Sequence, residues 1–225
     1  MPLFPFASLK THSSLSEFSA ILFDMDGVLV DSYDAWISAD KEFLREYAVD
    51  PSGSLYAQFH GSSILGVYEI LSETRNMPES YEVFRSRRVS FVNEEIYKTV
   101  SLMPGALAFL EHVTSRIPSA LASASEREWV ETALMQNNIT HHFGAIVSAT
   151  DVNGKGKPAP DIFLKAAEKL GIAPEECLVL EDSHNGILAG KRAGMIVGAY
   201  DNGRNKSQDL SPADFVFSDF SELFF

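Results

Sequence analysis

The sequence has 225 residues, enough for one large hydrophobic core or for a core domain with a smaller partner domain. Its formal net charge of −13 disfavours binding to nucleic acid or to an acidic membrane surface, so neither is expected as a partner, and any attraction for a phosphate group must be local. The single cysteine, Cys177, excludes an internal disulfide, and no apolar run approaches the roughly 18 residues that a membrane span needs.

The N-terminal segment 1–18 has scattered aromatic and serine residues but no continuous apolar stretch of the kind found in secretory signals. We predict a poorly ordered extension there, in a cytoplasmic protein that is a monomer or a weak homodimer. The first strand-like run, AILFDM, follows at 20–25. Residues 34–101 then show helical patterns and no convincing strand. These helical patterns span 35–48, 62–75 and 79–98.

From residue 102 onward, short apolar runs alternate with amphipathic helical patterns. The strand-like runs are 119–123, 144–149, 177–181, 195–200 and 214–217, and the helical patterns are 126–137, 161–170 and 185–193. Such alternation requires crossover connections and a mostly parallel sheet with helices on both faces. The sequence therefore predicts a Rossmann-like α/β core made of residues 19–33 and 102–225, with an inserted all-helical cap at 34–101.

Polar side chains follow the predicted strands at the edge where ligands bind in open α/β sheets. Asp24 and Asp26 follow the first strand, and Gly27 allows the backbone to turn sharply there. The other polar groups are Ser123 after the second strand, Lys157 in the loop after the third, and Glu181 and Asp182 at the end of the fourth. Several polar groups on one rim of a sheet are a stronger indication of a site than any one of them alone.

The types of these residues indicate one kind of chemistry. Several carboxylates form an oxygen-rich site that suits a hard cation such as Mg²⁺. A lysine and a hydroxyl in the same crater can hold the oxygens of a phosphoryl group. One carboxylate could attack phosphorus while its neighbour delivers a proton to the leaving oxygen. The sequence therefore predicts phosphoryl chemistry on a small phosphorylated metabolite, with Mg²⁺ as the cofactor.

Four segments closely resemble the motifs of the haloacid dehalogenase superfamily: FDMDGVLVDS, ALASAS, GKPAPDIFL and LEDSHNGILAG. The place of the helical insertion resembles the branch that includes β-phosphoglucomutase and many sugar-phosphate phosphatases. The resemblance implies that Asp24 is the nucleophile that becomes an aspartyl phosphate, and that Asp26 is the general acid and base. It also implies phosphate binding by Ser123, Ala124 and Lys157, and Mg²⁺ binding by Asp24, the backbone carbonyl of Asp26, Asp182 and, directly or through water, Glu181.

Asp26 favours phosphate-ester chemistry, because the dehalogenases and phosphonatases of this superfamily lack a second aspartate. The choice between phosphatase and mutase rests on positions where members similar to β-phosphoglucomutase carry a histidine, an arginine and a Lys-Asn pair. Here those positions hold Trp36, Ile64 and the pair Glu126–Arg127. We therefore expect a phosphomonoester hydrolase of the sugar-phosphate type, with a phosphomutase as the alternative and a non-catalytic phosphate-binding protein as a remote one.

The cap is expected to supply substrate specificity, but its sequence carries no readable code. Trp36 and Asp40 are the candidates for substrate contacts, although packing in a core explains Trp36 equally well. The basic residues Arg85, Arg87 and Arg88 are expected to form a solvated helix face, with one arginine as a less favoured substrate contact.

Overall fold

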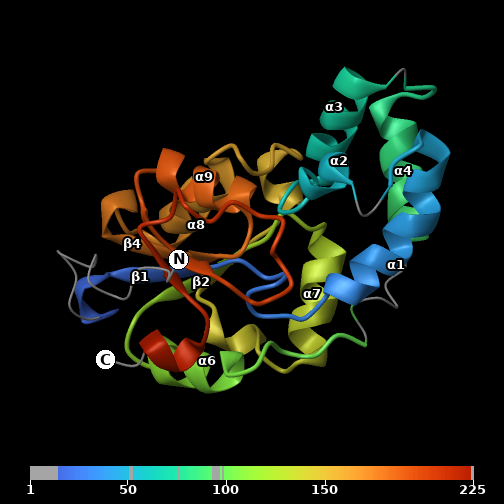
Figure 1. Ribbon diagram of the computed structural model, residues 1–225. Coiled ribbons are helices and arrows are strands. Elements are labelled where there is room, and N and C mark those ends of the chain that lie inside the picture. Colours follow the sequence, from blue (N-terminus) through green and yellow to red (C-terminus); the bar gives the residue numbers. More distant parts are fainter. Residues whose placement is uncertain (1–14, 51–52, 76, 93–96, 98, 224–225) are drawn as a thin grey trace.

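The computed structural model describes residues 15–50, 53–75, 77–92, 97 and 99–223 (Figure 1). Most of the expected N-terminal extension therefore lies outside the described residues. Its last part, Leu15–Glu17, forms a 3-10 turn, and the side chains of Leu15 and Phe18 are buried in the hydrophobic core. Among the described residues, no helix combines the length and apolar character that a membrane crossing requires.

A six-stranded sheet with the order β3-β2-β1-β4-β5-β6 forms the core, and every neighbouring pair of strands is parallel. The strands are β1 (Ala20–Phe23), β2 (Ser119–Ala122), β3 (Ala145–Val147), β4 (Cys177–Glu181), β5 (Ile196–Tyr200) and β6 (Phe215–Phe217). The predicted α/β fold is confirmed. Several strands end earlier than predicted, because residues such as Asp24 and Ser123 leave the sheet at its carboxyl edge.

Alternating side chains of β1 pack on opposite faces of the sheet, as a strand buried on both sides requires. Ile21 and Phe23 join one hydrophobic cluster, whereas Ala20 and Leu22 join the other. The first face is covered by α6 (Ala106–Thr114) and α7 (Arg127–Gln136), and the second by α8 (Asp161–Leu170) and α9 (His184–Arg192) (Figure 1).

Helix α6 was not predicted, although its sequence carries a helical signal. Its buried residues, Ala106, Phe109, Leu110 and Val113, have the i, i+3, i+4, i+7 spacing of an amphipathic helix. Gly105 precedes the helix with a φ of +79°, in the left-handed region that glycine adopts readily.

The helices between β1 and α6 lie together on one side of the sheet domain, and we call them the cap (Figure 1). Those with described bounds are α1 (Tyr33–Phe43), α2 (Ser54–Ala57), α3 (Ile64–Thr74) and α4 (Tyr81–Phe91), with a 3-10 turn at Leu44–Tyr47. Rings of Phe43, Tyr47 and Phe84 lie 5.5–5.8 Å apart and join α1 to α4. Aromatic packing therefore joins these cap helices, and the three rings belong to the same hydrophobic cluster as Ile21 and Phe23 of β1.

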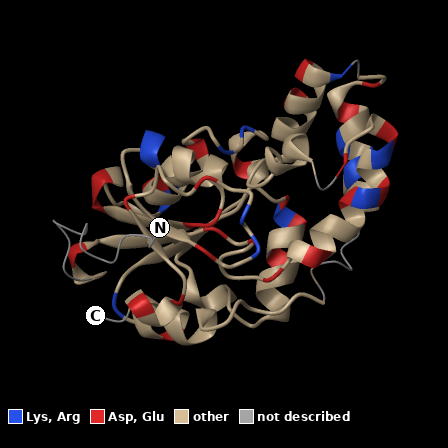
Figure 2. Cartoon of the chain, viewed as in Figure 1, with Lys and Arg blue, Asp and Glu red and all other residues tan. Residues whose placement is uncertain are grey.

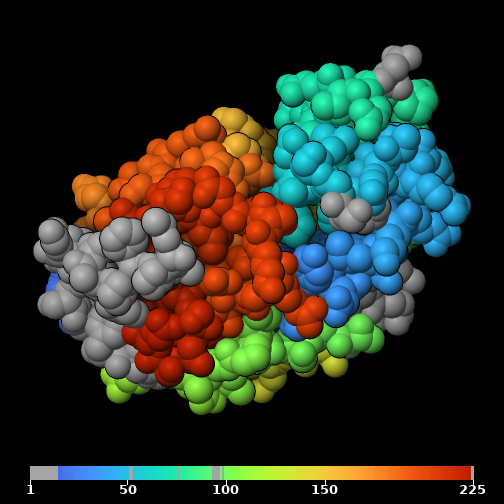
Figure 3. All heavy atoms as spheres, viewed as in Figure 1, coloured from blue at the N-terminus to red at the C-terminus, as the bar shows by residue number. Residues whose placement is uncertain are grey.

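Hydrogen bonds hold the cap against the sheet domain. Asn185 at the start of α9 places Nδ2 3.0–3.1 Å from the carbonyls of Gln58 and His60 and from the hydroxyl of Ser62. Gln208 Nε2 donates to the carbonyl of Ala57 at 3.0 Å. In the space-filling view, the blue and teal cap segments meet the orange and red C-terminal segments along a continuous boundary (Figure 3). The cap therefore lies closed over the carboxyl edge of the sheet.

Candidate active site

Asp24 and Asp26 lie just beyond β1, which is an interior strand of the sheet. The backbone N–H of Asp24 donates to the carbonyl of Leu180 at 3.0 Å, so the pairing with β4 positions Asp24 one residue past the strand. Gly27 has a φ of +80°, and a Cβ atom there would lie 2.2 Å from Oδ2 of Asp182. Glycine therefore allows both the turn after Asp26 and the close approach of Asp182.

Lys157 is buried between two carboxylates. Its Nζ contacts Oδ1 of Asp24 and lies 2.5 Å from Oε1 of Glu181, and its side chain is fully buried. Burial alone would lower the pKa of Lys157, but Asp24 and Glu181 outweigh that effect and hold it above its usual value. Oε2 of Glu181 accepts hydrogen bonds from the backbone N–H groups of Asp182 and Ser183 and from the Ser183 hydroxyl. Glu181 thus orients Lys157 and the turn that follows β4.

The crater contains an acidic cluster that fits a divalent cation. Asp24, Glu181 and Asp182 each offer one carboxylate oxygen, and these oxygens lie within 4.8 Å of one another. Burial raises the pKa of Asp24 to about 8; Lys157 opposes this shift, and Glu181 and Asp26 add to it. Burial raises the pKa of Asp182 well above its usual value, and the carboxylates of Glu181 and Asp24 add to this shift. A hard cation with oxygen ligands would remove this repulsion and favour the ionised forms.

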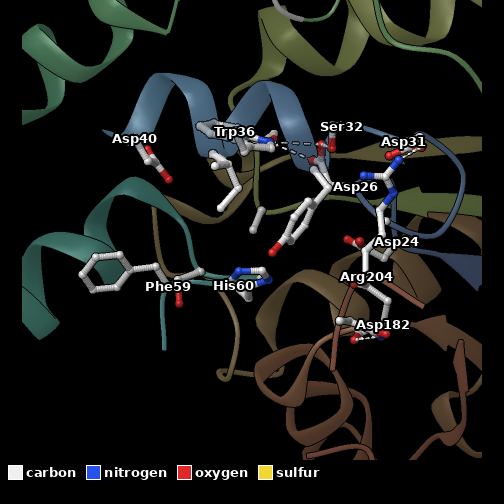
Figure 4. A pocket seen from close by; sticks show the side chains of 18 of the residues that line it. Asp24, Asp26, Asp31, Ser32, Trp36, Asp40, Phe59, His60, Asp182 and Arg204 are labelled. Atoms are coloured by element: carbon white, nitrogen blue, oxygen red, sulfur yellow. Dashed lines mark hydrogen bonds and ion pairs between the residues drawn. The ribbon is translucent and has the colours of Figure 1, made fainter. Parts of the chain in front are cut away.

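Asp26 is held by donors from both domains (Figure 4). Its Oδ1 accepts hydrogen bonds from Ser32 Oγ at 2.6 Å, Tyr97 Oη at 3.1 Å and Trp36 Nε1 at 3.3 Å. Its Oδ2 accepts a hydrogen bond from Ser125 Oγ at 3.0 Å. Burial raises the pKa of Tyr97 well above its usual value, so this phenol stays a donor. Since Trp36 and Tyr97 come from the cap, the cap's position and the orientation of Asp26 are coupled.

The sequence did not predict the roles of Ser32, Tyr97 and Ser125. Both serines lie inside the quoted motifs, so a signal for them existed. Tyr97 lies 71 positions from Asp26 in the chain and has no motif around it, so only docking of the cap brings the two together.

The remaining predicted phosphate ligands lie at the end of β2. Ser123 is fully buried, and its Oγ accepts a hydrogen bond from the backbone N–H of Ser125 at 3.1 Å. Ala124 lines the pocket between the cap and the sheet, together with Asp24, Asp26 and Asp182. The pocket thus reaches from the carboxylates to the cap, and Ser123, Lys157 and Glu181 are packed behind its surface.

The predicted cap residues Trp36 and Asp40 both line this pocket. Figure 4 shows them on α1, facing Phe59 and His60 across the cavity. Trp36 also packs edge-to-face against Trp129 of α7, with ring centroids 5.7 Å apart. Trp36 therefore combines the two roles that its sequence position left open, since it packs in the core and lines the pocket.

The prediction of a solvated basic helix face was wrong for Arg88. Figure 2 shows basic residues gathered along α4, but Arg88 is only 5% exposed and pairs with Asp40 at 2.5 Å. Position 88 follows the buried Phe84 by one helical turn, which places both on the inner face of α4. Arg85 and Arg87 do point outward, where they pair with Glu126 and with Glu46 and Glu79. Asp40 lies on the otherwise apolar stripe of α1, and a buried carboxylate needs a cation as partner, so this residue was the sequence signal for an inward-facing arginine.

Comparisons with known proteins agree with this geometry. The model of a family described as haloacid dehalogenase-like hydrolase matches residues 21–200. The chain is 31% identical over 211 residues to a probable pseudouridine-5'-phosphatase of Drosophila melanogaster, covering 90% of each chain. It is 33% identical over 186 residues to a phosphorylated carbohydrates phosphatase of Thermotoga maritima, covering 78% of this chain and 82% of the relative. The structure of a β-phosphoglucomutase from Clostridium difficile has the same fold, with a TM-score of 0.78, 24% identity, and coverage of 92% and 94%.

Proposed function

Because this chain belongs to the haloacid dehalogenase-like hydrolase family, we propose that it is a Mg²⁺-dependent phosphatase that acts on small sugar-phosphate-type metabolites through an aspartyl phosphate. Relatives named as phosphatases support a hydrolase of phosphomonoesters. The observation that carries the proposal is the contact between Lys157 and Asp24. Asp24 belongs to the acidic cluster and lies two residues before Asp26 in the chain. A cytoplasmic location and a monomeric or weakly dimeric state remain predictions from the sequence.

In the first displacement, a carboxylate oxygen of Asp24 attacks the phosphorus of the substrate. A bond forms between that oxygen and phosphorus while the bond to the leaving alcohol breaks, and Asp26 gives its proton to the leaving oxygen. Lys157 stays cationic, because its pKa is held above its usual value, and it offsets the charge on the phosphoryl oxygens. We expect Ser123 and Ala124, which follow the neighbouring strand β2, to support those oxygens.

In the second displacement, water takes the place of the alcohol and attacks the phosphorus of the aspartyl phosphate. Asp26 accepts the proton of that water, inorganic phosphate leaves, and the carboxylate of Asp24 is restored. The hydrogen bonds around Asp26 support Oδ2 as the oxygen that exchanges the proton. Three donors from the described residues occupy Oδ1, whereas Ser125 alone reaches Oδ2, which keeps acceptor capacity toward the substrate.

The acidic cluster would hold the metal ion, with Asp24 and Asp182 as side-chain ligands and Asp26 contributing its backbone carbonyl. When bound, Mg²⁺ would supply positive charge that compensates the phosphoryl oxygens. Glu181 already accepts from Lys157, Asp182 and Ser183, which supports a contact through water rather than direct ligation for this residue.

A phosphatase is favoured over a phosphomutase by the residues at the three diagnostic positions. A mutase must hold a second phosphate while its substrate turns round. Trp36 donates to Asp26, the Ile64 side chain is buried in the hydrophobic core, and Glu126 is paired with Arg85 at 2.8 Å. None of these three described positions offers a free cation to a second phosphate.

The test is a Mg²⁺-dependent phosphate-release screen across sugar phosphates, nucleoside monophosphates and small phospho-acids. We expect hydrolysis that stops with Asp24→Asn, while the exposed control Asp219→Asn keeps wild-type rates. Mass spectrometry after acid quenching should find one phosphoryl group on the peptide that carries Asp24. If folded Asp24→Asn retained about a tenth of the wild-type activity, the assignment of Asp24 as the nucleophile would be ruled out. Conversion between phosphate isomers that needs a bisphosphate would favour the mutase instead.

A further inference from the structure

The loop that follows β5 contacts the acidic cluster, although none of the four sequence motifs includes this loop. β5 ends at Tyr200 and pairs with β4, and Asn202 lies two residues beyond its end. Asn202 therefore reaches the carboxyl edge of the sheet where Asp24 and Asp182 lie, and it lines the same pocket. The mechanism proposed above does not use this residue.

The side-chain amide of Asn202 joins two segments of the site. Its Nδ2 donates to Oδ2 of Asp182 at 2.9 Å and to the carbonyl oxygen of Gly27 at 2.9 Å. Gly27 directly follows Asp26, whose backbone carbonyl is a proposed metal ligand. Asn202 therefore connects the turn after β1 with the turn after β4, and both turns carry proposed metal ligands.

The shape of the loop explains the amide oxygen of Asn202 but not its nitrogen. Oδ1 accepts hydrogen bonds from the backbone N–H groups of Arg204 at 2.9 Å and Asn205 at 3.1 Å, which is the turn-forming role that asparagine often has. The turn does not need the two N–H groups of the amide, and these are the groups that donate to Asp182 and Gly27. Acceptors face one end of the amide and donors the other, so the hydrogen-bond network fixes its orientation.

The three carboxylates of the acidic cluster are held by different partners. The amine of Lys157 contacts Asp24 and Glu181, and it keeps these two carboxylates in place. The side chain of the third, Asp182, is held by the hydrogen bond from Asn202. Asn202 therefore does for Asp182 what Lys157 does for the other two, without adding charge.

The main chain around Asp182 is arranged to allow this contact. Asn205 is only 3% exposed, and its Nδ2 donates to the carbonyl oxygens of Asp182 at 2.7 Å and Tyr200 at 2.8 Å. A Cβ atom on Gly27 would lie 2.2 Å from Oδ2 of Asp182 and 3.1 Å from Nδ2 of Asn202. The loop after β5 thus holds both the side chain and the main chain of Asp182, and the glycine leaves room for the hydrogen bond.

We propose that Asn202 is a positioning residue for the metal site. It holds the carboxylate of Asp182 in place for the cation and keeps it at a fixed separation from the turn that contains Asp26. Groups that hydrogen-bond to metal ligands orient them, and loss of such a group typically weakens metal binding by roughly 10–100-fold. The inference rests on the proposed Mg²⁺-dependent function, and in it Asn202 acts through Asp182 without touching the metal ion or the substrate.

The test replaces Asn202 by serine and uses Asn137→Ser as the matched control. Serine keeps an oxygen that can accept from the N–H groups of the loop, but its single hydroxyl does not replace two amide donors. Asn137 is also partly buried, and its Nδ2 donates to the carbonyl oxygens of Val100 at 3.3 Å and Ala133 at 2.9 Å, outside the pocket. The control therefore loses a similar amide without changing the metal site.

Isothermal titration calorimetry without substrate measures Kd for Mg²⁺, and the Mg²⁺ dependence of phosphate release gives a second readout. Asn202→Ser should raise Kd about tenfold or more, whereas Asn137→Ser should leave it within roughly twofold. Because Asp24, Asp26 and Lys157 are unchanged, saturating Mg²⁺ should bring kcat of Asn202→Ser to within about threefold of wild type. An unchanged Kd in folded Asn202→Ser overturns the inference, even if activity falls.

The proposed function and the role of Asn202 fail separately in this design. If the wild-type protein binds Mg²⁺ but hydrolyses no phosphomonoester, the proposed function fails, and the Kd values still decide the role of Asn202. If it binds no Mg²⁺, both fail. If Asn202→Ser does not fold, a crystal structure of the wild-type protein with Mg²⁺ decides. There, Asp182 should ligate the metal ion while its Oδ2 keeps the hydrogen bond to Asn202, and an Asp182 side chain that leaves Asn202 overturns the inference.

Discussion

The edge of the sheet and the inner wall of the cap face the same pocket, but they differ in the balance of acidic and basic side chains. At the sheet edge, three carboxylates crowd together around the single amine of Lys157. In the cap, Arg88 meets Asp40 one to one. The sheet edge therefore needs further positive charge, which a metal ion supplies, whereas the cap is already balanced. Changes at the sheet edge should affect turnover and stability, and changes in the cap should mainly affect which substrate is used.

The largest effect is expected when the amine buried between Asp24 and Glu181 is removed. Lys157→Met leaves Asp24 and Glu181 buried without their partner, at a cost of about 3–5 kcal/mol in the free energy of unfolding. The melting temperature should fall on the order of 10 °C, and phosphate release by roughly 1,000-fold or more. Differential scanning calorimetry and phosphate assays measure the two quantities.

Lys165→Met is the matched control for this change. Lys165 forms an exposed pair with Glu168 within α8, at 2.8 Å, and such pairs contribute about 0–1 kcal/mol. Equal losses of stability in the two variants would show that the contrast between a buried and a surface cation is wrong.

The next effect is the stabilisation by the metal ion. Without the metal ion, the pKa of Asp24 is raised from 3.8 to about 8. Between these two pH values, the folded protein keeps a proton on Asp24 that the unfolded chain has released. The stability that this proton provides is complete below pH 3.8 and is lost as the pH rises through about 8. Mg²⁺ must displace the proton, so it should stabilise the protein more at pH 8 than at pH 6.

At a free concentration 100 times Kd, the stabilisation should be about 2.7 kcal/mol. Melting curves with Mg²⁺ or EDTA at the two pH values measure it, and EDTA should also stop phosphate release. Identical Mg²⁺-induced shifts at pH 6 and pH 8 would contradict the assignment of Asp24 to the metal site.

The two regions also differ in how far the sequence alone predicts them. Asp24 and Ser123 follow buried strands and Glu181 is the last residue of another. Because parallel strands bring their carboxyl ends to one edge, the proximity of these residues follows from the fold class. The cap residues have no such rule. Whether Arg88 points inward depends on the register of α4 against α1, and the contact of Tyr97 with Asp26 depends on cap docking. These are long-range packing outcomes, for which a single sequence holds only indirect signals such as the polar Asp40 on an apolar stripe.

Removing a hydrogen bond from the cap to Asp26 tests whether the cap and the sheet edge are coupled. Tyr97→Phe removes one donor of Oδ1 without changing the ring that packs near Trp36 and Trp129. We expect kcat to fall about tenfold, or ~1.4 kcal/mol, with little change in KM, because the general acid is less well oriented while the pocket wall is kept.

Tyr68→Phe is the control for this prediction, since it removes a cap hydroxyl that donates to the carbonyl of Glu79 at 2.9 Å, away from Asp26. Steady-state kinetics on the same substrate compare the two variants. If Tyr97→Phe raises KM and leaves kcat unchanged, Tyr97 contributes to binding and does not position Asp26.

The smallest effect is expected at the charged contact between the two regions. Arg85 of α4 pairs with Glu126 before α7 at 2.8 Å, but the Arg85 side chain is 44% exposed, so the pair should contribute at most about 1 kcal/mol. Arg85→Gln should change kcat/KM less than roughly fivefold, and the difference should shrink as salt increases. Asn185→Ala removes the neutral contacts to the segment 58–62 and should have a larger effect that is independent of salt. Kinetics in low and high salt distinguish the variants. A larger, salt-sensitive loss in Arg85→Gln would mean that charge, rather than the hydrogen bonds of Asn185, holds the cap closed.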